Sequence, residues 1–134
     1  MKCYNCNQEM VKKYDYHLYD EYIGNHIINC EYYQCEYCKD ELLPIQSLQQ
    51  IELFEKTIIK ELLLKNFHPS TAVYLTIDEV ATLENTTVEY ILNDKKFNLW
   101  VYHIVFNNEI LYLKDSYLKH KETGNIGFVK LIKE

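Results

Sequence analysis

Two Cys-x-x-Cys pairs constrain the fold of this chain more than any other feature. Cys3 and Cys6 form the first pair, and Cys35 and Cys38 form the second. Each pair directs two sulfurs toward one point, and two pairs together complete a tetrahedral set of thiolates for zinc. Four thiolates leave no open coordination position. The sequence therefore predicts one Zn²⁺ ion per chain, with a structural and not a catalytic role.

A dithiol redox centre is the alternative, because a single Cys-x-x-Cys pair can cycle between thiol and disulfide. Two pairs near one terminus, with no thioredoxin-like βαβ pattern around them, favour metal binding. Cys30 has no partner at this spacing and is either a small buried residue or a replacement ligand. We expect His17 and His26 to be strand or turn residues, since four thiolates already fill the site.

The segment between the two pairs predicts a β-hairpin. Apolar and polar residues roughly alternate along residues 11–19, which places Tyr14, Tyr16 and Leu18 on one face and Lys13, Asp15 and His17 on the other. Gly24-Asn25 predicts the turn, and residues 27–34 predict the second strand. Residues 1–43 are thus expected to form a zinc ribbon, whose core is too small to be stable without the metal.

Residues 44–66 carry the clearest helical pattern. Apolar residues form a stripe of Ile51, Phe54, Ile58 and Leu62, with Leu48, Ile59 and Leu63 beside it. This connecting helix is either core for its neighbours or the seam of a homodimer through residues 45–66. Residues 67–73 interrupt the pattern with His68-Pro69-Ser70 and predict a linker.

Residues 74–134 predict a second domain that begins with two short helices. Thr76 and Glu79 fit a capping box for the first helix, which would bury Ile77, Val80, Ala81 and Leu83. Asn85-Thr86-Thr87 separates it from a helix over 88–96, with Ile91 and Leu92 facing inward. Beyond these we expect a strand over 98–106, a turn at Asn107-Asn108, a strand over 109–113, a helix over 115–121 and a last strand over 125–132. The predicted class is α+β: a zinc ribbon, a connecting helix and a winged-helix-like helix-turn-helix domain.

Two parts of the chain resemble known families. MKCYNCNQEM, Tyr22-Ile-Gly24 and the run from Tyr33 to Leu43 are similar to the YgiT-type zinc finger, the amino-terminal module of MqsA-type antitoxins. This resemblance covers about residues 1–65, and it places the zinc ligands at the four paired cysteines. Residues 74–121 resemble the excisionase and MerR-like helix-turn-helix domains, in which a hairpin forms the wing. MqsA itself carries an all-helical Xre-type second module, so the second half departs from that family.

The resemblance implies a DNA-binding role that the charge does not favour. The chain has a formal net charge of -6 and no arginine, so it lacks the residue that most often contacts guanine. The polar residues of the expected recognition helix are Thr86, Thr87, Glu89, Asn93, Lys95 and Lys96. Asn93 could pair with adenine and the Thr87 methyl could contact thymine, while lysines would contact phosphate.

Two functions therefore remain open. The first is a zinc-binding, DNA-binding transcriptional regulator, an antitoxin-like protein whose partner would be a basic toxin. The second is an acidic protein-interaction module, an adaptor or inhibitor of a basic nucleic-acid enzyme, that does not touch DNA. Thirteen tyrosines fit such an interface.

Catalysis and membrane insertion are not expected. The sequence has no glycine-rich phosphate loop, and its five histidines are scattered, so we do not expect an enzyme. No apolar run approaches the roughly 20 residues that span a bilayer, and the amino terminus lacks a signal sequence. We therefore expect a cytoplasmic protein without membrane contact.

Overall fold

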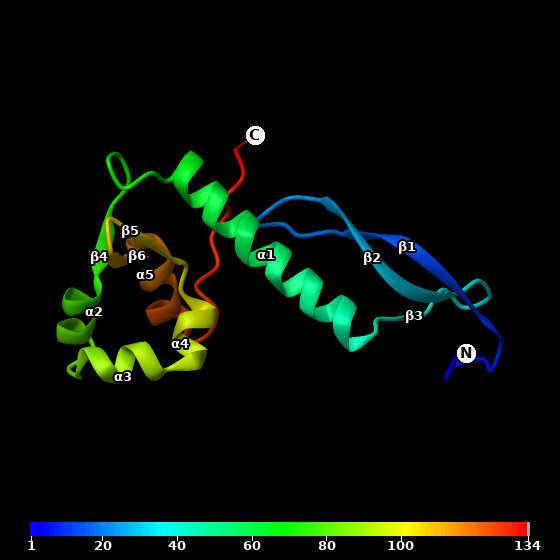
Figure 1. The fold of residues 1–134 in the computed structure, drawn as a ribbon. Coiled ribbons are helices and arrows are strands. Elements are labelled where there is room, and N and C mark those ends of the chain that lie inside the picture. Colours follow the sequence, from blue (N-terminus) through cyan, green and yellow to red (C-terminus); the bar gives the residue numbers. More distant parts are fainter. Residues whose placement is uncertain (134) are drawn as a thin grey trace. The chain divides into compact units, whose positions relative to one another are not determined.

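The computed structural model describes residues 1–133 and divides the chain into two compact units, Met1–Ile58 and Ile59–Glu134 (Figure 1). Each unit combines a small antiparallel sheet with helices, and α1 (Ile45–Asn66) contributes residues to both. Acidity is concentrated in the first unit, which has five lysines and ten acidic residues, whereas the second has nine lysines and ten acidic residues. None of the described helices is both long and apolar enough to cross a membrane.

The first unit is a three-stranded sheet with the beginning of α1 against it. Its strands are β1 (Met10–Leu18), β2 (His26–Cys35) and β3 (Glu41–Leu42), in the order β1-β2-β3. The β1–β2 hairpin is the one that the alternating pattern predicts, and Gly24 has the positive φ of 87° that its turn requires. A small core forms where Ile28 and Cys30 of β2 meet Ile51 of α1. The Ser47 hydroxyl fixes the start of α1 by donating to the Glu31 carbonyl.

The pairing register of the hairpin changes between Lys13 and Asp15, so that Cys30 and Glu31 of β2 lie opposite Tyr14. We expected Tyr14 to share a face with Tyr16 and Leu18. Tyr14 is 55% exposed, whereas Tyr16 and Leu18 pack on the core around Ile28 and Ile51. The extra residue of the bulge lies in β2, so the alternation along β1 itself continues, but the core covers only the part of this face from Tyr16 onward.

The connecting helix follows its predicted bounds, and parts of its apolar stripe are buried within this chain. Ile51 and Leu63 are buried, and Phe54 packs against the first core. Leu48, expected beside the stripe, is instead exposed. The stripe therefore supplies core residues, which was the first of its two expected roles.

The second unit contains the remaining elements. They are β4 (Tyr74–Thr76), α2 (Ile77–Leu83), α3 (Val88–Asn93), α4 (Lys95–Trp100), β5 (His103–Phe106), β6 (Glu109–Leu113) and α5 (Lys114–Thr123). The strands form one antiparallel sheet in the order β4-β6-β5. Its core includes Tyr112 of β6 and one residue from each of the four helices: Val80, Ile91, Phe97 and Tyr117.

Local capping explains where α2 and α3 begin. Thr76 and Glu79 form the predicted capping box at α2. Thr87 caps α3 by accepting the Tyr90 N–H, and Asn85 makes the turn between the helices with a φ of 54°. The two short helices and the polar turn between them are thus as the sequence predicts. Leu83 and Leu92 were expected to face inward, but both side chains are exposed.

Three predicted elements of this unit are wrong, and two of them meet at Asp94. The helix expected over 88–96 ends at Asn93, because Asp94 leaves the helical conformation and caps a new helix by accepting the Phe97 N–H. That new helix, α4, occupies 95–100, so the strand expected over 98–106 begins only at His103. The aromatic and branched residues there favoured a strand, but the cap at Asp94 starts a helix.

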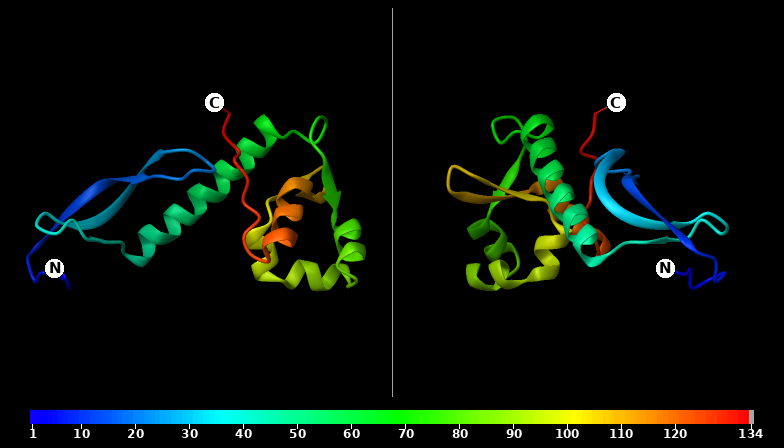
Figure 2. Two further views of the ribbon diagram at one scale, coloured as in Figure 1. Left: turned by 180° about the vertical axis from the view of Figure 1, so that it is seen from behind. Right: turned by 45° about the vertical axis from the view of Figure 1, so that its right-hand side comes forward.

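The strand expected over 125–132 does not form either. The chain runs beside α5 without strand pairing (Figure 2). It is held by single contacts: the Gly127 N–H donates to the Trp100 carbonyl, and the buried Ser116 hydroxyl donates to the Gly127 carbonyl. Leu131 is fully buried, so the tail contributes this residue to the core without forming a strand.

Candidate metal centre

Each Cys-x-x-Cys pair lies in a tight loop closed by its own backbone. In the first loop, the Asn7 N–H donates to the Cys3 carbonyl at 2.9 Å and the Cys3 N–H donates to the Gln8 carbonyl at 2.8 Å. Asn7 has a φ of 60°, a left-handed conformation that asparagine tolerates. These bonds turn the chain so that both cysteine side chains point to the inside of the loop.

The second loop repeats the same bonds at the end of β2. The Lys39 N–H donates to the Cys35 carbonyl at 2.8 Å, and the Cys35 N–H donates to the Asp40 carbonyl at 2.8 Å. Lys39 has a φ of 69°, which matches the turn residue of the first loop. The β1–β2 register pairs Met10 with Cys35 and so brings the two loops together.

The four predicted ligands converge. The Sγ atoms of all four cysteines lie within 4.8 Å of one another. The Sγ–Sγ distances are 3.5 Å for Cys3–Cys38, 3.2 Å for Cys6–Cys35 and 3.6 Å for Cys6–Cys38. A tetrahedral site with metal–sulfur bonds of about 2.3 Å would separate its sulfurs by roughly 3.8 Å. The cluster could therefore hold a metal ion with little movement.

The surroundings favour a thiolate at Cys35. The Cys38 N–H donates to Cys35 Sγ and lowers the pKa of the Cys35 thiol to about 6, despite burial. Burial and the hydrogen bonds among the sulfurs instead raise the pKa of the Cys38 thiol to about 12. Cys3 and Cys35 are buried, whereas Cys38 is exposed. Asn5 of the first loop donates its side-chain amide to Asp40, which follows the second loop, so the loops are also tied to each other outside the sulfurs.

The other candidate ligands lie elsewhere. Cys30 is buried with Ile28 and Ile51, and this burial raises the pKa of its thiol. His26 bonds to the Ile23 carbonyl and packs against Phe54, and His17 stacks on Tyr19. Among the described residues, the four paired cysteines are the one group that could hold a metal.

The residues proposed for DNA contact lie around α3 and the start of α4. Thr87 is the exposed cap of α3, and Glu89 and Asn93 are exposed on α3 itself. Thr86 is half-buried in the preceding turn, whereas Lys95 and Lys96 are exposed in the first turn of α4. The break at Asp94 therefore puts the two lysines on a different helix from Asn93.

Exposed apolar side chains on α2, α3 and α4 were not anticipated from the sequence. Leu83 is 59% exposed, Tyr90 61%, Leu92 48% and Leu99 64%. Periodicity had assigned Leu83 and Leu92 to the core, and Leu99 to a strand. The short helices need fewer core residues than the pattern supplies, because Val80, Ile91 and Phe97 already fill the interior.

Comparisons of the chain with protein-family models, with curated proteins and with solved structures gave no match.

Proposed function

We propose that the four-cysteine cluster holds one structural zinc ion. Thiolates are soft ligands that suit zinc, and a complete set of four leaves no position for a reacting water. The convergence of the sulfurs supports this assignment. Metal analysis of the purified protein should give one zinc per chain. A chelator that removes this zinc should also unfold residues 1–43.

We further propose that the second unit is a winged-helix-like DNA-binding domain of a transcriptional regulator. The observation that carries this proposal is the chain order: α2, a tight turn and α3 precede the β5–β6 hairpin, in a sheet ordered β4-β6-β5. In such a domain α3 would enter the major groove and the hairpin would lie beside it as a wing.

The side chains around α3 suggest how bases would be contacted. The Thr87 hydroxyl is engaged in capping, which leaves its methyl for a thymine. Asn93 is exposed and carries the amide that suits adenine. Lys95 and Lys96 would contact phosphate, and Glu89 would discourage phosphate close to its own position.

The test is binding to DNA from upstream of the protein's own gene, over a salt series and against unrelated DNA. Site-selective affinity should fall as salt rises, because counterions return to the phosphates. Replacing Lys95 and Lys96 with alanine should reduce the salt slope by about 0.9 for each lost phosphate contact. A matched control replaces Lys56 and Lys60 of α1, which removes the same charge. Equal losses in both variants, or no selective binding, would contradict the proposal.

A protein-binding role is the second candidate, and the exposed Leu83, Tyr90, Leu92 and Leu99 favour it. Such side chains suit a protein interface better than a phosphate surface. The partner would be basic, a toxin or a nucleic-acid enzyme, since the chain as a whole carries a formal net charge of -6. This antitoxin-like or adaptor role predicts that Leu99→Lys abolishes capture of a basic partner. The Lys95 and Lys96 variants would leave that capture intact.

A further inference from the structure

The outer edge of β1 is open. β1 is an edge strand of its sheet. The Met10 N–H donates to the Met1 carbonyl, and its β2 partner Cys35 donates to Asp40, so the Met10 amide points away from β2. Backbone groups of alternate residues point the same way, which places those of Lys12, Tyr14 and Tyr16 on the same outer edge. Within residues 1–133, none of these outward groups has a hydrogen-bond partner.

The open stretch is complementary in charge to itself. Lys13 and Asp15 flank Tyr14 symmetrically. If the same stretch of a second chain lay antiparallel with Tyr14 opposite Tyr14, each lysine would face an aspartate of the other chain. Opposite charges directly across a strand pair stabilise it, whereas like charges destabilise it.

We propose that two copies of this chain dimerise through β1, with a two-fold axis at Tyr14. Lys13 then pairs with Asp15 of the second copy, and Asp15 with its Lys13. The outward backbone groups of Lys12, Tyr14 and Tyr16 close the ladder. This joins the two sheets into one continuous antiparallel sheet across the axis.

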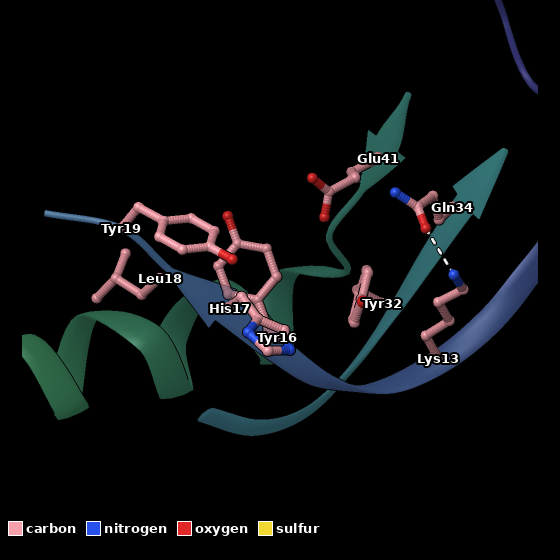
Figure 3. Close-up of a pocket in the computed structure, with 8 residues that line it drawn as sticks. All are labelled: Lys13, Tyr16, His17, Leu18, Tyr19, Tyr32, Gln34 and Glu41. Carbon is pink, nitrogen blue, oxygen red and sulfur yellow. Dashed lines mark hydrogen bonds between the residues drawn. The ribbon is translucent and has the colours of Figure 1, made fainter. Parts of the chain in front are cut away.

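The two charged side chains of the stretch differ in their contacts within the chain. Lys13 Nζ donates to Gln34 Oε1 at 2.6 Å (Figure 3) and lies 3.3 Å from Glu36. In the dimer this ammonium would turn from Glu36 to Asp15 of the second copy. The Asp15 carboxylate has no hydrogen bond or ion pair within the described part of the chain.

Two features restrict the contact to a suitable partner. The amino-terminal segment already occupies the edge at Met10, so pairing is confined to the following residues. Lys12 and Lys13 oppose incoming strands that carry no acid opposite them, which is how edge lysines limit unspecific pairing. A second copy supplies the aspartate where it is needed.

The test is a charge exchange in the full-length, zinc-loaded chain. Sedimentation should show a dimer at about 100 µM, since dimer populations depend on concentration. Lys13→Glu and Asp15→Lys should each weaken dimerisation about tenfold or more, because each places two like-charged pairs across the axis. Mixing the two variants should restore a heterodimer, detected by native mass spectrometry. In that heterodimer the introduced glutamate of one chain would face the introduced lysine of the other.

Control measurements distinguish the dimer contact through β1 from other dimer contacts and from misfolding. Zinc content and circular dichroism show whether each variant is folded, and recovery on mixing excludes loss of structure as the cause. Leu53→Lys, at an exposed position of α1, should leave the dimer intact. Exchange of the Tyr14 amide hydrogen should slow as the dimer forms. A monomeric wild type, failure to recover on mixing, or a dimer broken by Leu53→Lys alone would overturn the proposal.

Discussion

Cys3 and Cys35 occupy equivalent positions in two loops with the same backbone hydrogen bonds. Each cysteine carbonyl accepts the N–H of the residue four positions later, and each cysteine N–H donates to the carbonyl five positions later. The left-handed residues Asn7 and Lys39 also correspond. The two halves of the metal site are therefore built in the same way, one before and one after the β1–β2 hairpin.

Replacing a ligand should unfold the first unit selectively. Cys35→Ser removes a buried sulfur from the cluster, and a module this small depends on its metal. We expect loss of zinc and of the dispersed NMR signals of residues 1–43, while most signals of residues 74–133 persist. The matched control is Cys30→Ala, which lies outside the cluster and should keep its zinc. Equal loss of signals from both units in Cys35→Ser would contradict this prediction.

The Glu84 carboxylate should make the second unit sensitive to acid. Burial alone would raise the pKa of Glu84, but Lys121 at 2.8 Å and the Tyr117 hydroxyl at 2.9 Å together lower it. A pKa lowered by folding contributes stability above the unfolded value of about 4.3, and this stability is lost as the pH falls through the folded value. Thermal unfolding between pH 7 and pH 3 should show this decline.

Glu84→Gln should reduce that acid-dependent loss and lower stability at neutral pH by about 1 kcal/mol, the scale of a partly exposed ion pair. Glu122→Gln is the control, because Glu122 is exposed on α5. If the two variants have the same pH profile, Glu84 is not the responsible group.

The tail, residues 125–133, should detach from α5 when a side chain is added at Gly127. A Cβ at Gly127 would lie 2.1 Å from the Ser116 carbonyl oxygen and 3.0 Å from that of Trp100. Both are backbone atoms, so Gly127→Ala should cost several kcal/mol, on the order of an overpacked core site. Gly124→Ala is the matched control: its φ of 66° is unfavourable for alanine, but its surroundings are open. It should cost only about 1 kcal/mol. Denaturant unfolding of the two variants gives the comparison.

The Ser116 hydroxyl should contribute separately to holding the tail. It accepts the Tyr102 N–H at 2.9 Å and donates to the Gly127 carbonyl at 2.6 Å, and the residue is fully buried. Ser116→Ala leaves both groups without this partner, so we expect a loss of about 1–3 kcal/mol. Faster amide exchange at Gly127 and Leu131 would locate the loss in the tail. Unchanged exchange there would contradict the prediction.

The Asp94 cap should control where α4 begins. Its carboxylate accepts the Phe97 N–H at 3.1 Å and its carbonyl accepts the Asn98 N–H at 3.1 Å. Asp94→Ala removes the first of these bonds and should cost about 1 kcal/mol. Asp94→Asn should retain most of the stability, since asparagine caps comparably well. The melting temperatures of the two variants distinguish capping from a general effect of charge.

Sequence patterns predicted those structural features that depend on residues close together in the chain. The cysteine loops, the capping box at Thr76 and the connecting helix follow from residues a few positions apart. The register shift opposite Tyr14 was not predictable, because it arises in the strand across the hairpin. The conformation of the tail was not predictable either. Its apolar residues suit a strand, but they pack separately against α5 and the core. Asp94 was a readable signal for a new helix that the β-prone residues after it concealed.

The matching loops at the metal site imply how such a protein can change length. Each loop is closed by its own bonds, and the hairpin merely delivers one loop to the other. Strands could therefore lengthen by equal numbers of residues on both sides, in steps of two that keep the same faces inward. Related proteins could differ widely in the spacing between Cys6 and Cys35. The two residues inside each pair, and the left-handed residue just after it, would remain fixed.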